Sequence, residues 1–162
     1  MVRVFTQTYG VVGAIIEKDG KILLVKESVE KGPDAGKWNN PSGWVHVGEN
    51  PIEEVKREVK EETGFDFTPT HILGIYSIFR KDLIKDFEQI RHPIRVIFIG
   101  KINKHQGQFK KEEIAETKWF SPEEIKKMDS NNLRHIDIKT MVKDYFAGKK
   151  YPIELLTHTI SE

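Results

Sequence analysis

Four glutamates recur at helical spacing within one short segment of this 162-residue chain: Glu54, Glu58, Glu61 and Glu62. At about 100° of rotation per helical residue, their side chains fall within a sector of roughly 100° on one helix face. Like charges three and four residues apart repel by a few tenths of a kcal/mol per pair, so the cluster needs a compensating cation. Arg57 compensates in part, but a hard divalent cation suits converging carboxylate oxygens better, and magnesium completes its shell with water and substrate phosphates. The spacing therefore predicts metal-dependent phosphate chemistry, with a solvated acidic surface as the alternative.

The residues around this cluster predict a helix that begins at Pro51 and ends near Gly64. Asn50 is a favoured N-cap residue, proline is favoured at the first helical position, and glycine after the last turn is typical of a left-handed C-cap. An apolar stripe lies beside the acidic face and consists of Ile52, Val55 and Val59. The helix should therefore bury one flank and present its carboxylates at the edge of a cleft.

Strand-like and loop-like segments alternate around this helix. A β-branched run from Val11 to Glu17, a turn at Asp19-Gly20 and an apolar run from Lys21 to Lys26 predict two paired antiparallel strands. Glycine, proline and asparagine between Glu27 and Asn40 predict a surface loop, and the charged segment from Arg80 to Pro93 is a candidate ligand loop. Further strands are expected at His71 to Phe79, Ile94 to Ile102 and Lys118 to Phe120, with helices after Ser121 and at Asp137 to Phe146. This order predicts a mixed α/β domain.

Composition narrows the class of protein. The chain has 26 Lys and Arg against 25 Asp and Glu, a net charge of +1, so no global field attracts nucleic acid or anionic lipid. The absence of cysteine excludes disulfides, thiolate catalysis and cysteine-based metal sites. No apolar run approaches the roughly 18 residues of a membrane span. We expect a single domain over residues 1–162, a cytoplasmic location, no membrane association and no obligate nucleic-acid partner.

The segment from Gly43 to Phe65 resembles the Nudix box, whose pattern is Gly-x5-Glu-x7-Arg-Glu-U-x-Glu-Glu-x-Gly-U with U apolar. Every fixed position is filled, by Gly43, Glu49, Arg57, Glu58, Val59, Glu61, Glu62, Gly64 and Phe65. The resemblance covers most of residues 10–128. It implies the α+β Nudix fold, an α/β/α sandwich around a mixed β-sheet that carries a catalytic loop–helix–loop. It also implies metal-dependent hydrolysis of a nucleoside diphosphate joined to another group.

Roles carried over by position follow from this resemblance. The metal-binding groups would be the carboxylates of Glu58, Glu61 and Glu62, together with the backbone carbonyl of Ser42. Glu58 would also orient or deprotonate the attacking water. Arg57 would hold Glu58 in place by a charge-assisted contact, and Glu49 would approach the same site from the loop. Gly43 and Gly64 would be structural members of the motif.

Two positions depart from the common form of the box. Ser42 stands where the family usually has a glycine, so we expect it to be tolerated only if its backbone avoids positive φ. His46 replaces an outer acidic residue, and it is either a contact for substrate phosphate or a structural, solvent-facing side chain. The general base also stays open, because similar proteins use either a box glutamate or a glutamate on a later loop. The candidates are Glu58, Glu113 and Glu116, although the last two could be simple turn residues.

Substrate contacts are expected outside the box. Trp38, Tyr76 and Phe79 can stack on a nucleobase, although strand aromatics normally belong to the core. The cationic candidates for contact with phosphate or carboxylate are Lys26, Arg80, Arg91 and Arg95. Glu113 and Glu116 are further candidates for substrate binding.

The leading hypothesis is a magnesium-dependent Nudix diphosphohydrolase that also accepts manganese. Metal-activated water would attack one phosphorus of a small phosphorylated substrate, with a nucleotide expected. A homodimer is compatible with this hypothesis. The alternative is a Nudix-fold sensor that binds a nucleotide without hydrolysing it, and turnover of a nucleotide panel would distinguish the two.

Overall fold

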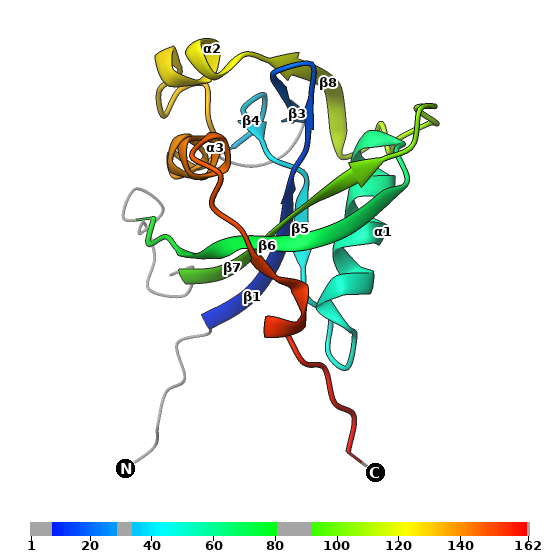
Figure 1. The fold of residues 1–162 in the computed structure, drawn as a ribbon. Helices are drawn as coiled ribbons and strands as arrows, with labels where there is room; N and C mark the ends of the chain where they lie inside the picture. The colour runs from blue at the N-terminus through cyan, green and yellow to red at the C-terminus, as the bar shows by residue number, and fades with distance from the viewer. Residues whose placement is uncertain (1–7, 29–33, 81–91, 162) are drawn as a thin grey trace, which may run out of the picture.

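The computed structural model describes residues 8–28, 34–80 and 92–161 (Figure 1). The strands are β1 (Thr8–Ile15), β2 (Glu17–Lys18), β3 (Lys21–Glu27), β4 (Trp38–Asn39), β5 (Ser42–Trp44), β6 (Phe67–Ser77), β7 (His92–Ile102), β8 (Ile114–Phe120) and β9 (Tyr151–Pro152). The helices are α1 (Pro51–Thr63), α2 (Pro122–Lys127) and α3 (Ile138–Phe146), followed by a 3₁₀ turn at Ile153–Leu155. None of the helices in these ranges is both long enough and apolar enough to cross a membrane.

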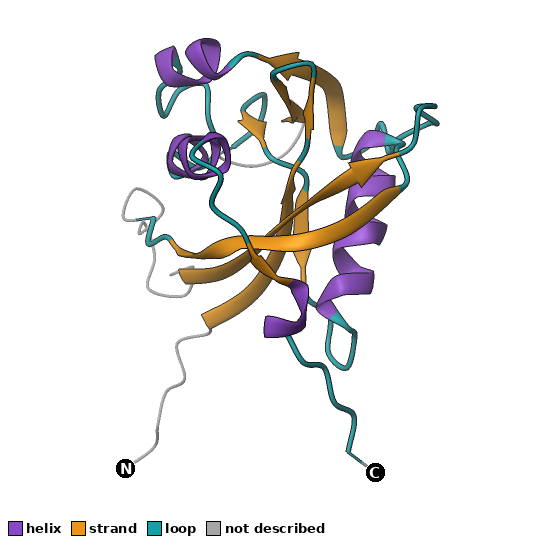
Figure 2. Ribbon diagram, viewed as in Figure 1, coloured by secondary structure: helices purple, strands orange, loops and turns teal. Residues whose placement is uncertain are grey.

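Within the described ranges, the strands form two sheets. A five-stranded mixed sheet has the order β5-β1-β7-β6-β9, in which β1 and β7 run parallel and the other neighbours run antiparallel. In the second sheet, β3 pairs with β2, β4 and β8. Helix α1 contacts β1, β5 and β6, whereas α3 lies on the other side of the mixed sheet with α2 beside it (Figure 2). The expected α/β/α sandwich is confirmed.

Each face of the mixed sheet has its own apolar cluster. Val55 and Val59 of α1 are fully buried and pack on the face that contains Phe98, as the predicted apolar stripe requires. Met141 of α3 packs on the opposite face, which contains Ile97. Ile97 and Phe98 are adjacent in β7, and alternate strand residues point to opposite faces. The sheet is therefore covered on both faces, and the packing of Val55 and Val59 fixes α1 on one of them.

The predicted hairpin is correct only near its turn. Asp19 and Gly20 have φ of 52° and 76°, which suits a tight two-residue turn, and they join β2 to β3. Of the predicted first strand, only its end approaches β3: Glu17 and Lys18 pair with it, and the Ile16 carbonyl accepts the Leu23 N–H at 3.0 Å, because the chain passes from one sheet to the other at Ile16. β1 instead pairs with β5 and β7 in the interior of the mixed sheet. The prediction that residues from Val11 onward pair with β3 was wrong, since a nearly continuous apolar run also suits a strand buried on both faces.

The local signals for α1 are confirmed by its caps. The Asn50 side chain accepts the Ile52 N–H at 3.0 Å, and Gly64 has φ of 77° with its N–H donated to the Lys60 carbonyl at 2.9 Å. A short strand, β4, forms inside the segment predicted as a loop. Most of the candidate ligand loop, residues 81–91 with Arg91, lies outside the described residues.

Candidate active site

The strand β5 passes directly over the carboxylate face of α1. A Cβ at Gly43 would overlap the carboxyl group of Glu58, so only glycine allows this close approach. Ser42 is extended in β5 and is not among the positive-φ residues, which fulfils the condition predicted for its tolerance. Its backbone N–H donates to Glu62 Oε2 at 2.9 Å. The strand therefore fixes the position of two of the helix carboxylates.

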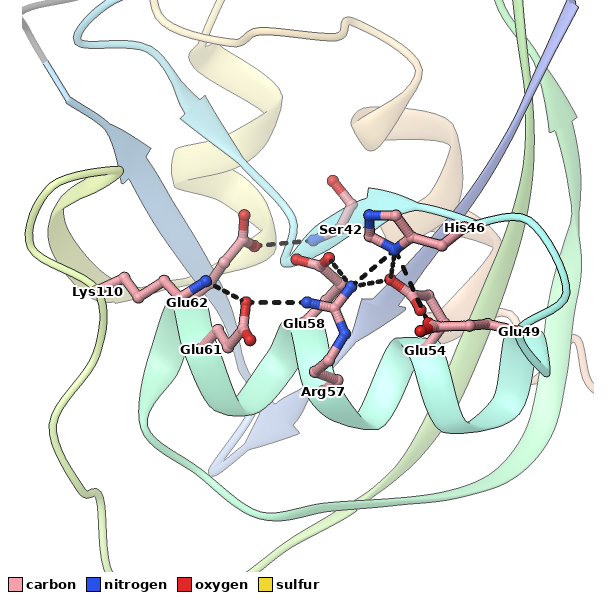
Figure 3. Close-up of polar contacts among 9 residues, drawn as sticks. All are labelled: Ser42, His46, Glu49, Glu54, Arg57, Glu58, Glu61, Glu62 and Lys110. Atoms are coloured by element: carbon pink, nitrogen blue, oxygen red, sulfur yellow. Dashed lines mark hydrogen bonds and ion pairs between the residues drawn. The ribbon is translucent and has the colours of Figure 1, made fainter.

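Arg57 lies at the centre of the site, between Glu58 and Glu61 on one side and Glu54 on the other (Figure 3). Its Nη2 donates to Glu58 Oε1 at 2.9 Å, and its Nη1 donates to Glu61 Oε2 at 3.1 Å. Nη2 also contacts Glu54 Oε1. Although burial opposes its charge, the contacts with Glu54 and Glu58 raise the pKa of Arg57. Arg57 is thus a permanent cation that orients carboxylates on successive turns.

The three box carboxylates differ in their electrostatic surroundings. Burial raises the pKa of Glu58, although the Arg57 charge opposes the rise. Glu62 is buried, and burial raises its pKa well above the usual value despite the hydrogen bond from Ser42. Burial has the same tendency at Glu61, but hydrogen bonds from Lys110 and Arg57 outweigh it and lower the pKa. A cation at this face would stabilise the charged forms of Glu58 and Glu62.

These carboxylates line one cavity of about 500 Å³ between β5, α1 and the segment before β8. The lining residues are Glu27, Ser28, Ser42, Gly43, Trp44, His46, Arg57, Glu58, Glu61, Glu62, Lys110, Glu112, Glu113 and Arg134. Oxygen ligands from several carboxylates suit magnesium or manganese. The residues present therefore fit a hard divalent cation, and the cavity has room for a phosphate group.

Glu54 and Glu49 lie apart from this cavity. The Glu54 side chain is 0% exposed and contacts Arg57 and His46, with His46 Nδ1 at 3.0 Å from Glu54 Oε1. Glu49 is half exposed, and its Oε2 lies 3.8 Å from the same His46 nitrogen. The expectation that Glu54 presents its charge at the cleft edge was wrong, because its carboxylate is buried and contacts Arg57 and His46.

The ligand atoms of His46, Glu49 and Glu54 lie within 4.8 Å of one another, which is close enough to hold a metal ion. The Arg57 guanidinium already lies at this cluster, with Nη2 at 3.2 Å from His46 Nδ1. A cation is therefore already present at the point where a second one would bind. We interpret the cluster as the anchor of Arg57. His46 belongs to this anchor and also lines the carboxylate cavity.

The predicted cationic substrate contacts fall into two places. Arg80 and Arg95 line a smaller cavity of about 70 Å³ that shares Ser42 and Gly43 with the carboxylate cavity. Arg80 pairs with Asp34, and the buried Arg95 pairs with Asp137 and donates to Asn40 Oδ1 at 2.6 Å.

Lys26 instead pairs with Glu116 across β3 and β8, with 4.0 Å between Nζ and Oε2. Neither residue lines either cavity.

The predicted aromatic platforms belong mainly to the core. Trp38 packs edge-on against Phe120, with ring centroids 4.8 Å apart. Tyr76 is partly buried against the same cluster and donates its hydroxyl to Asp144 at 2.8 Å. Phe79 is 44% exposed and lies beside His92.

Sequence reasoning missed Lys110 and Arg134. Lys110 Nζ lies 2.7 Å from Glu61 Oε2, and Arg134 Nη1 lies 2.7 Å from Glu27 Oε1. These partners are 49 and 107 residues apart in the chain, so no local spacing could identify them. Glu113, by contrast, was a predicted site residue, and it does line the carboxylate cavity with its neighbour Glu112.

Comparisons with known proteins bear on the family and the fold of this chain. The family model for the NUDIX domain matches residues 6–139. Phosphatase NudJ of Escherichia coli strain K12 is 28% identical over 147 residues, which are 90% of this chain and 88% of that protein. A NUDIX hydrolase from Nitrosomonas europaea is 31% identical, covers 94% of this chain and 98% of its own, and superimposes with a TM-score of 0.80. The MutT protein from Methanosarcina mazei Go1 is 26% identical, covers 90% and 98% respectively, and has a TM-score of 0.73.

The family match, the fold and the complete box agree with one another. The resemblance and the sandwich fold expected from the sequence are confirmed. Nudix hydrolases depend on divalent metals, and the relatives lend no support to the non-hydrolytic alternative. Since the NUDIX model spans most of the chain, the chain belongs to the Nudix hydrolase family.

Proposed function

We propose that this Nudix hydrolase uses magnesium, or manganese in its place, to hydrolyse the diphosphate linkage of a small nucleotide-like substrate. The observation that carries the proposal is the convergence of Glu58, Glu61 and Glu62 on one cavity, with Arg57 connecting two of them. The all-oxygen donor set favours a hard cation, and the absence of cysteine is in keeping with it. The E. coli relative carries the name of a phosphatase, which supports phosphate release as the outcome.

We assign the metal to Glu58, Glu61, Glu62 and the carbonyl of Ser42. When bound, divalent ions neutralise phosphate oxygens and acidify a water molecule. Residues of the chain hold these carboxylates in position. Ser42 N–H holds Glu62, and Arg57 holds Glu58 and Glu61 at fixed angles. Preorganised groups of this kind need no rearrangement during the reaction.

Glu58 is our first choice for the residue that orients or deprotonates the attacking water. It lines the carboxylate cavity, and its Oε1 accepts a hydrogen bond from Arg57 Nη2 at 2.9 Å, which orients the carboxylate. Glu113 is the second choice, because it lines the same cavity from another segment. Glu116 has less support, since it pairs with Lys26 outside the cavity. Glu49 is assigned to the anchor of Arg57 together with Glu54.

We place the organic part of the substrate in the smaller cavity beside Ser42 and Gly43. Arg80, Arg95 and Trp44 line this cavity, so two positive charges and an aromatic ring lie next to the carboxylate cavity. Trp38 and Lys26 are weaker candidates for substrate contact, because Trp38 packs on the core and Lys26 is engaged by Glu116. A single domain over residues 1–162, a cytoplasmic location, a homodimer and the lack of an obligate nucleic-acid partner stay predictions.

The proposal is tested by incubating the purified protein with magnesium and a panel of nucleoside triphosphates, nucleoside diphosphates and sugar nucleotides. Phosphate release is measured directly and again after pyrophosphatase or phosphatase coupling. Turnover that needs added metal and disappears in Glu58→Gln would support the assignment. Tight binding of one compound without turnover would instead favour a sensor.

A further inference from the structure

Lys110 places an ammonium group beside the metal-binding carboxylates. Its Nζ lies 2.7 Å from Glu61 Oε2, the same oxygen that accepts Arg57 Nη1 at 3.1 Å (Figure 3). Two cations thus meet one carboxylate oxygen. An ammonium has three N–H donors, and the contact with Glu61 uses one of them. Lys110 therefore has donors to offer a second anion in the cavity that it lines.

The segment that carries Lys110 is fastened to the end of α1. Lys110 N–H donates to the Glu61 carbonyl at 2.8 Å, and Gly107 N–H donates to the Gly64 carbonyl at 2.8 Å. The Gln106 side chain donates to the Thr63 carbonyl, also at 2.8 Å. These bonds satisfy carbonyls that the end of a helix leaves without intrahelical partners. The position of the ammonium is therefore set by the same helix that carries the carboxylates.

Folding stability is a poor explanation for this arrangement. The Lys110 side chain is 49% exposed, and exposed ion pairs typically change a folding equilibrium by less than about tenfold. The ammonium of a lysine with this exposure is charged at neutral pH. Its location in a cavity suited to phosphate points to a role in binding.

The other cations that line the cavity are already engaged. Arg57 contacts three carboxylates, and Arg134 pairs with Glu27 and Asp34. Lys110 is held by a single described carboxylate, Glu61. That carboxylate is also the one expected to turn toward a divalent ion.

We propose that Lys110 is a substrate-binding residue, whose ammonium passes from Glu61 to an oxygen of the substrate diphosphate once Glu61 binds metal. This inference rests on the proposed function of the same cavity. The exchange keeps each charge paired, because Glu61 gains the metal as Lys110 gains the phosphate. It also predicts that Lys110 and the metal compete for Glu61 when substrate is absent.

The test compares Lys110→Gln with Lys110→Arg and with Lys111→Gln, a matched control at an exposed neighbour that does not line the carboxylate cavity. Manganese affinity without substrate is measured by electron paramagnetic resonance. Affinity for methylenediphosphonate, a non-hydrolysable diphosphate, is measured by calorimetry at saturating magnesium. KM and kcat are then measured on the best substrate.

In Lys110→Gln, we expect manganese to bind as tightly as in wild type or more tightly. We expect methylenediphosphonate affinity to fall and KM to rise by about tenfold or more, the usual effect of losing a charged hydrogen bond. Lys110→Arg should restore most of this loss, and Lys111→Gln should match wild type.

The inference is overturned if Lys110→Gln binds methylenediphosphonate like wild type. It is also overturned if metal and diphosphate affinities fall together, since that pattern indicates a structural role, or if Lys111→Gln loses as much affinity as Lys110→Gln. Failure of the proposed function looks different, because wild type itself would then turn over no compound in the panel.

Discussion

Replacing Glu62 by glutamine should separate catalysis from folding. Glu62 is buried, and burial raises its pKa well above 4.5, so the folded protein without metal disfavours the ionised form. Glutamine has nearly the same size, and its side-chain oxygen can still accept the Ser42 N–H now found at 2.9 Å. The substitution therefore removes a charge without removing the hydrogen bond.

The expected effect on stability is positive when metal is absent. Each unit by which burial raises the folded-state pKa costs the ionised protein about 1.4 kcal/mol at a pH above both pKa values. Each kcal/mol regained raises the melting temperature of a domain of this size by about 2–4 °C. Glu62→Gln should thus melt at or above the wild-type temperature in chelator, while its turnover falls by about 10²-fold or more, or about 2.7 kcal/mol in transition-state stabilisation.

The sign of the pH dependence follows from the same shift. A carboxyl with a raised folded pKa contributes its stability below 4.5, the pKa of an ordinary glutamate, and loses it as pH rises toward the folded value. Metal-free wild type should therefore lose stability over this range more steeply than Glu62→Gln. Glu58 has a shift of the same sign and is present in both proteins, so the comparison isolates the effect of the change at Glu62.

The assay pairs thermal melts in chelator, at several pH values, with turnover at saturating magnesium. Glu53→Gln is the matched control, because Glu53 lies on the same helix with a side chain that is 65% exposed and pairs with Lys56. The control should keep wild-type turnover. Near-normal turnover in Glu62→Gln, or a marked loss of its metal-free stability, would refute the reasoning.

Three further predictions concern the helix, the strand above it and the metal. Val59→Ala should cost about 1–3 kcal/mol in chemical denaturation, because Val59 is fully buried, and activity per folded molecule should stay within a few-fold of wild type; a large fall in that activity would contradict its purely structural role. Gly43→Ala should lower kcat by about tenfold or more, because its Cβ would displace the Glu58 carboxyl group, and unchanged kinetics would show that β5 moves freely. Chelation should abolish turnover, magnesium or manganese should restore it, and calcium should bind yet support little chemistry because its coordination is longer and looser; activity that survives thorough chelation would exclude the metal assignment.

Much of the site could be predicted because its geometry is local. Glu58, Glu61 and Glu62 share a helix face through the period of the helix alone, and that period follows from backbone hydrogen bonding. Asn50 and Gly64 mark the ends of α1 for equally local reasons, since a side-chain acceptor and a left-handed residue satisfy the helix termini. The box therefore determines both the helix and the face that carries the proposed metal ligands.

Partners brought together from distant segments could not be predicted in this way. Glu54 has the same residue type and spacing as the proposed metal ligands, yet its side chain is 0% exposed and contacts Arg57 and His46. Lys110 reaches Glu61 only because a distant segment caps the end of α1. Arg95 similarly pairs with Asp137 across 42 residues, although its charge alone suggested a phosphate contact.

The chain by itself determined the fold family, the catalytic helix and its carboxylate face, because helical period, caps and an apolar stripe act within a few residues. The tertiary structure alone decided which strand each apolar run joins and which charges are buried or exposed. It also decided which cation meets which carboxylate. Those outcomes depend on sheet order and on packing, which are set by contacts between segments far apart in the chain.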